Sequence, residues 1–209
     1  MKGVLLKDLY IAKSNILVTA VSLIVLGFGL SFLLETGALL ILAPAVCVTA
    51  VFISITSDAG SKWNKNVITM PVSRSQIIGE KFIFYILLAA SGILAALIPC
   101  GILAAGGRAV TFQSLWLYGS IGLSAALLSG SISLPCAYLS EPEKSQIVFM
   151  MSFLASSGII TALVYAVNLF LPVKDYTLLT FCIVLAVACF CFFLSYKTAV
   201  KIYQKRDIV

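Results

Sequence analysis

The sequence contains no histidine, and only 11% of its 209 residues are charged. Without histidine, the chain lacks the side chain that most often binds zinc and acts as a general base. A soluble domain carries charge on about a quarter of its residues, so the polar cover that water requires is also missing. We therefore expect no catalytic residue, no metal site and no cofactor in this chain, and lipid around most of its surface.

Apolar runs dominate instead, because 61% of the residues are hydrophobic and the mean hydropathy is +1.11. A helix of about 20 apolar residues crosses the hydrocarbon layer, and one charge at its centre costs about 2.5–3.5 kcal/mol. The sequence therefore predicts an all-α integral membrane protein with six transmembrane helices in a single domain, residues 1–209. The predicted spans, none with a charged residue in its interior, are about 16–34, 38–56, 82–105, 112–139, 147–171 and 176–196.

Basic residues lie mostly on one side of these spans. The predicted inner segments hold 12 of the 14 Lys and Arg residues, and the outer ones hold only Arg108 and Lys174. The positive-inside rule then places both termini in the cytoplasm. Since topology accounts for the basic excess, a nucleic-acid partner is not expected.

The longest polar stretch is the segment 57–81, between the second and third predicted spans. A helix from about residue 59 onward would place Trp63, Val67 and Met70 on one apolar stripe. Two interpretations stay open for such a helix. It floats in the headgroup layer with Trp63 as an interfacial anchor, or it docks against a soluble partner.

The ends of this predicted helix also have sequence signals. Ser57 or Asp58 can cap its start, and Pro71 would end it. Ser73 and Gln76 then fit the S-x-x-Q pattern of a capping box, which would restart the helix of the third span.

The first 15 residues predict an amphipathic helix in the membrane plane before the first span, although the pattern is imperfect. Lys7 and Asp8 would form its polar side. The apolar arc opposite them would consist of Leu5, Leu6, Leu9, Tyr10 and Ala12.

Small residues recur at four-residue spacing in the fourth predicted span, at Gly122, Ala126 and Gly130. Such a ladder lets another helix approach closely. It fits tight packing within the chain, or a polar-lined or moving interface along a transport path.

Two stretches also carry a family resemblance. The chain opens with MKGVLLKDLY, and Asp58, Trp63, the run MPVSR at residues 70–74 and GEK at 79–81 follow the second span. These stretches resemble segments of small ABC-2-type transporter permeases, similar to the membrane subunits that export phenol-soluble modulins and bacteriocin-type peptides. The short loop at 172–175 departs from the pattern, because it leaves little room for the re-entrant hairpin that such permeases often carry.

The resemblance implies a type-2 ABC exporter fold, with a coupling helix that docks into a separate ATP-binding subunit. The chain has no G-x-x-x-x-G-K-[ST] loop, so ATP and Mg²⁺ would be bound by that partner. It further implies a second permease, identical or related, in a bacterial cytoplasmic membrane. The expected substrate is amphipathic or hydrophobic, and a peptide is favoured over a lipid. The residues that would form the docking segment are Asp58, Lys62, Trp63, Val67, Met70, Pro71, Ser73 and Arg74.

Three alternatives compete with the exporter. A six-span substrate-binding subunit of a vitamin importer would need larger outer loops than this sequence has. An intramembrane enzyme would need paired carboxylates or histidines on inward helix faces, which the sequence pattern does not reveal. A membrane scaffold would leave no signature of its own.

Overall fold

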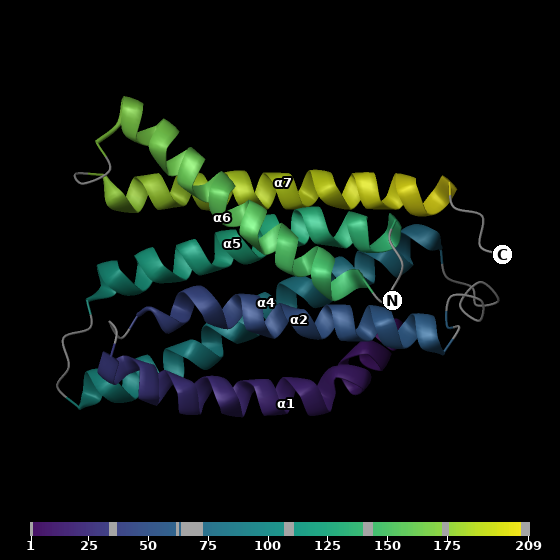
Figure 1. Cartoon of the computed structure of the whole chain (residues 1–209), viewed down its shortest axis with the longest axis horizontal. Helices are drawn as coiled ribbons and strands as arrows, with labels where there is room; N and C mark the ends of the chain where they lie inside the picture. Colours follow the sequence, from purple (N-terminus) through teal and green to yellow (C-terminus); the bar gives the residue numbers. More distant parts are fainter. Residues whose placement is uncertain are drawn as a thin grey trace.

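The computed structural model describes residues 2–33, 37–61, 63, 73–106, 111–139, 144–172 and 176–205. Within these ranges the chain forms six long helices and no strand. Each helix is long and apolar enough to cross a membrane, which confirms the prediction of an all-α chain with six spans. The helices are α1 (Lys2–Leu33), α2 (Leu39–Gly60), α4 (Arg74–Ala105), α5 (Phe112–Leu139), α6 (Ser145–Phe170) and α7 (Thr177–Lys205) (Figure 1).

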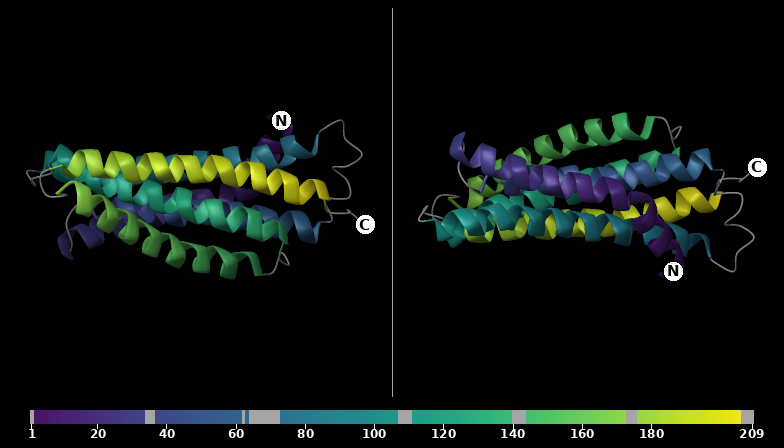
Figure 2. Two further views of the ribbon diagram at one scale, coloured as in Figure 1. Left: turned by 90° about the horizontal axis from the view of Figure 1, so that it is seen from above. Right: turned by 90° about the horizontal axis from the view of Figure 1, so that it is seen from below.

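The helices lie side by side along one long axis, except that α6 crosses the others obliquely (Figure 1). Both ends of the chain lie toward the same end of the bundle (Figure 2). The buried core is shared mainly by α2, α4, α5 and α7, with Phe52, Tyr85, Leu128 and Val184 among its members.

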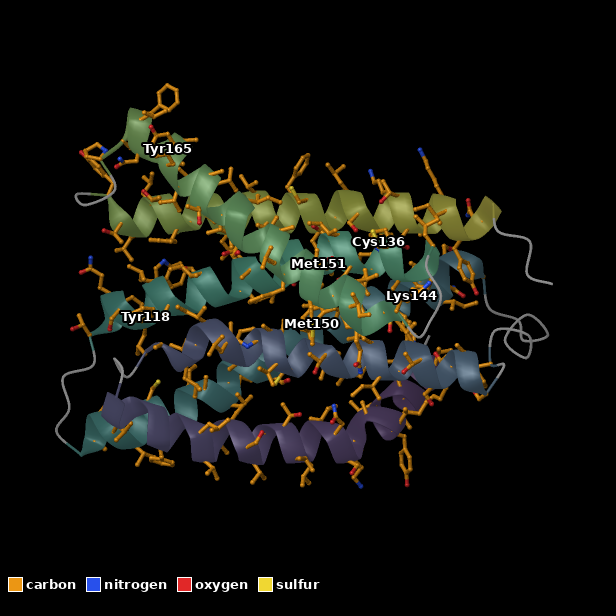
Figure 3. All side chains as sticks on the ribbon, viewed as in Figure 1. Tyr118, Cys136, Lys144, Met150, Met151 and Tyr165 are labelled. Carbon is orange, nitrogen blue, oxygen red and sulfur yellow. The ribbon has the colours of Figure 1, made fainter. Side chains whose placement is uncertain are left out.

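Apolar side chains also cover much of the outer surface. On α6, Met150, Met151 and Tyr165 are all more than 60% exposed (Figure 3). A soluble protein seldom exposes so much contiguous apolar surface. In a six-span protein, these side chains are the ones that face lipid.

Several helices are longer than the predicted spans. At about 1.5 Å per residue, the 32-residue helices α1 and α4 are about 48 Å long, against about 30 Å of hydrocarbon. The extra turns at one end of the predicted spans contain charged residues, which the sequence predicted to lie outside the spans. Lys7 and Asp8 lie in α1, Asp58 in α2, and Glu80 and Lys81 in α4.

The small-residue ladder of α5 packs against neighbouring helices of the same chain. A Cβ atom at Gly122 would collide with the carbonyl oxygen of Leu40 in α2, and one at Gly130 would lie 2.6 Å from the Tyr85 ring of α4. The Tyr85 hydroxyl donates to the Ala126 carbonyl at 2.6 Å. These close contacts are the ones expected if the ladder serves tight packing within the chain.

A matched pair of glycines on α5 tests this packing. Gly122→Ala should destabilise the protein by about 1–3 kcal/mol, because the new methyl group overlaps the backbone of α2. Gly119→Ala should be neutral or slightly stabilising, because that position is open and alanine favours helix. Thermal unfolding of both variants in detergent measures the difference, and equal midpoints would contradict the packing of α5 on α2.

Candidate functional site

Lys81 of α4 is buried, with only 5% of its surface exposed. Its ammonium group donates to the carboxylate of Asp8 in α1, to Oδ2 of Asp58 in α2 at 2.8 Å, and to Oγ of Ser54 in α2 at 2.7 Å. An ammonium group has three hydrogens to donate, so these contacts use all of them. One side chain thereby joins the ends of three helices at one end of the bundle.

A second lysine completes the arrangement. Lys7 Nζ lies 2.5 Å from Oδ1 of Asp58 and 3.0 Å from Oδ1 of Asp8. Each carboxylate therefore contacts both lysines, one through each oxygen. We call these four residues, Lys7, Asp8, Asp58 and Lys81, the ion cluster. Its two positive and two negative charges alternate, which is the arrangement that offsets the cost of burying them.

The ion cluster depends on which face of α1 points inward. Val4, Asp8 and Ala12 are buried and follow one another at four-residue spacing, so they form one stripe on the helix. Leu6, Leu9 and Tyr10, from the predicted apolar arc, are exposed. The sequence predicted Asp8 on the polar side of an interfacial helix, and in the structure its carboxylate is buried against Lys81 of α4. Where lipid surrounds the helix, apolar side chains face out and the carboxylate turns toward its partners.

Glu80 borders the ion cluster. Its side chain is 1% exposed, and neither carboxyl oxygen has a hydrogen-bond partner among the described residues. Its charged neighbours are Lys81, Asp8 and Lys7, and it also lies near the Tyr138 hydroxyl of α5. The Tyr138 ring packs edge-on against Tyr203 of α7, with 5.7 Å between ring centroids. Polar groups from five helices thus meet at this end of the bundle.

Similarity to a known protein family shows the class of protein in which this arrangement occurs. A family model described as ABC-2 family transporter protein matches residues 3–204, nearly the whole chain. The chain belongs to the ABC-2 transporter family. No curated protein and no solved structure matches it.

Membership makes this ABC-2 permease a multi-pass membrane component of a transporter and not a catalytic enzyme. It also implies an ABC ATP-binding partner. The match supports the permease interpretation over the vitamin-import subunit and the intramembrane enzyme.

Asp58, one of the predicted docking residues, is buried within the chain. It is 7% exposed and sits in the last turns of α2, which continues to Gly60. Neither Ser57 nor Asp58 therefore caps the start of a new helix, contrary to the sequence analysis. The carboxylate of Asp58 is held within the chain by the two lysines of the ion cluster.

Trp63 and Ser73, which belong to the segment between α2 and α4, are both described. Lys7 Nζ lies 4.4 Å from the centroid of the Trp63 ring, at the distance of a cation–π contact. Ser73 caps α4, because its hydroxyl accepts from the Gln76 backbone N–H while the Gln76 side chain accepts from the Ser73 N–H. This confirms the predicted capping box.

The remaining docking candidates cannot be placed in this way. Lys62, Val67, Met70 and Pro71 lie outside the described residues. Arg74 is the first residue of α4, but its side chain is not among those described. Their predicted role in docking stays a prediction.

The ion cluster as a unit was not predicted from the sequence. Its lysines were interpreted as topological charges and its carboxylates as loop or interfacial residues, and no paired carboxylates were expected on inward helix faces. The structure corrects this, because Asp8, Asp58 and Glu80 all face inward. They do not form a metal site, since no group of three or more potential ligands fits a metal among the described residues. The available signal was the stripe of Val4, Asp8 and Ala12, where an acid interrupts two small apolar residues.

Lys81 and Glu80 are adjacent and equally buried, so they form a matched pair for mutation. Lys81→Met should destabilise the protein by about 3–5 kcal/mol, because Asp8 and Asp58 are left with a single lysine. Glu80→Gln should have little effect, since it keeps the shape of the side chain and breaks no hydrogen bond to a described residue. Thermal unfolding in detergent distinguishes the two, and an equal loss in both variants would contradict the assigned roles.

Proposed function

We propose that this permease is the membrane subunit of a bacterial exporter, driven by a separate ABC ATPase that binds the segment between α2 and α4. The observation that carries the proposal is the attachment of this segment to the ion cluster. Asp58 lies just before its first residues, Lys81 lies in the first turns after it, and Trp63 within it contacts Lys7. A partner that holds the segment would therefore act on α1, α2 and α4 together.

The motor would lie in the partner chain. The permease has no phosphate-binding loop, so ATP and Mg²⁺ would bind to the ATPase. Six spans would form half of a translocation unit, with a second permease, identical or related, forming the other half. Both permeases would span a bacterial cytoplasmic membrane and be surrounded by lipid.

The proposed substrate is amphipathic or hydrophobic, and we favour a peptide over a lipid. All charged residues of the described helices lie toward the end that holds the ion cluster and the chain termini. The buried hydroxyls of Ser120, Ser124 and Ser129 in α5 donate to carbonyls of their own helix. A surface without charges offers little to a charged solute but suits an apolar one.

The proposed orientation has both termini in the cytoplasm. It rests on the 12 basic residues of the predicted inner segments against 2 in the outer ones, and on the two termini sharing one end of the bundle (Figure 2). In a background without the native cysteines, an impermeant thiol reagent added outside should label Gly107→Cys but not Asn64→Cys. Labelling of Asn64→Cys alone would show that the topology is the reverse of the proposed one.

The docking surface is tested on the predicted stripe of Val67 and Met70. The double variant Val67→Glu Met70→Glu should lose its ATPase, because two charges would enter an apolar contact. Thr69→Glu, on the opposite side of the predicted helix, is the matched control and should keep the ATPase. Trp63 is left unchanged because it also contacts Lys7.

The measurement is capture of the tagged permease from its native membranes, with any ABC ATPase identified by mass spectrometry. Membrane insertion of each variant is checked by its resistance to carbonate extraction. If the double variant retains as much ATPase as the unmodified chain, the stripe is not the docking surface.

A further inference from the structure

We infer that the ion cluster makes α1 move together with the segment between α2 and α4, with Lys7 and Lys81 as the positioning residues. The inference rests on the proposed function, in which an ATPase displaces that segment. It adds a specific consequence. α1, the least buried helix of the bundle, would move when the ATPase displaces the docking segment, although α1 is not part of that segment.

α1 has few other means of attachment. Its apolar stretch is the least buried of the six, and Val4, Ala12 and Leu23 are its only buried apolar residues among those described. Many of its remaining apolar side chains face outward, where lipid is as apolar as they are. Burial of apolar area therefore does little to hold a membrane helix in place, and close or polar contacts decide.

Two such contacts hold α1, one toward each end. Toward its C-terminal end, Gly27 allows a close approach, because a Cβ atom there would lie 2.7 Å from Leu39 and 2.8 Å from Pro99. Near its N-terminal end, the ion cluster is the attachment. Between them α1 changes direction, so that its first turns lean away from the axis of the rest (Figure 2). The cluster thus decides the position of the bent part.

Because of the pattern of charges, α1 cannot leave its neighbours by breaking one ion pair at a time. α1 supplies one lysine and one carboxylate, α2 supplies the second carboxylate, and α4 supplies the second lysine. Moving α1 away from its neighbours breaks the Lys7–Asp58 and Lys81–Asp8 pairs together. Both pairs are largely shielded from water, so water would not readily replace the lost partners.

Trp63 supplies a second connection from the segment to α1. It follows the end of α2 by three residues and its ring lies under the ammonium group of Lys7. A force on the segment would reach α1 through Trp63 and Lys7, and also through Asp58 and Lys81. Since both routes end on α1, displacement of the segment carries α1 with it.

The decisive variant is Lys7→Met Asp8→Leu. It removes one positive and one negative charge, so that Asp58 and Lys81 still neutralise each other at 2.8 Å and the fold is retained. All contacts of α1 with the ion cluster are lost, and so is the contact of Lys7 with Trp63. Lys13→Met is the matched control, because Lys13 lies on the same helix but is exposed.

The readout is a pair of spin-label distances in the permease–ATPase complex, in vesicles, with and without trapped ATP. Labels at Ser61 and Ile147 report movement of the segment relative to α6, and labels at Gly3 and Ile147 report movement of α1. All three sites are exposed. In the unmodified chain and in Lys13→Met, both distances should shift on ATP binding.

In Lys7→Met Asp8→Leu, the Ser61 distance should still shift, while the Gly3 shift should fall by at least half. An unchanged Gly3 shift in that variant would overturn the inference, and so would a Gly3 distance that never shifts in the unmodified chain while Ser61 does. If no ATPase binds, or if ATP shifts neither distance, the proposed function itself fails.

Discussion

Lys81 can remain buried as an ammonium group only because Asp8, Asp58 and Ser54 accept its three hydrogens. Those acceptors come from two other helices, and Lys7 completes the charge balance by contacting both carboxylates. The relative positions of α1, α2 and α4 at this end of the bundle follow from that requirement. Any displacement that takes one of these helices away from the others breaks two of the four ion pairs.

Farther from this end, the helices are held by close approach of backbones. Gly122 of α5 lies against the backbone of α2, and Gly92 of α4 lies against Ala43 and Pro44 of α2. Lipid provides no hydrophobic drive for helix association, so such contacts matter more than buried area. The molecule thus combines a charged attachment at one end with charge-free packing along the spans. This division fits a permease that is driven from the cytoplasm and presents an apolar path to its substrate.

Some features could be predicted because their signals are local. Runs without charge gave the six spans, and the pattern from Ser73 to Gln76 gave the cap of α4. The ion cluster could not be found this way, because the contacts within it join residues up to 73 positions apart and each member resembles a residue at a membrane boundary. Asp8 was predicted on the polar side of an interfacial helix, and its burial was not. An amphipathic pattern alone does not say whether lipid or protein covers the apolar side, and only the contact with Lys81 decides it.

The central claim is that an ATPase bound at the cytoplasmic face drives an apolar or amphipathic substrate out through this ABC-2 permease. The most direct test follows a fluorescent amphipathic peptide in inside-out membrane vesicles that contain the permease with its ATPase. The account predicts that the peptide accumulates inside the vesicles with ATP and does not accumulate with a non-hydrolysable analogue. Accumulation that does not depend on ATP hydrolysis, or none while the ATPase is bound and active, would contradict it.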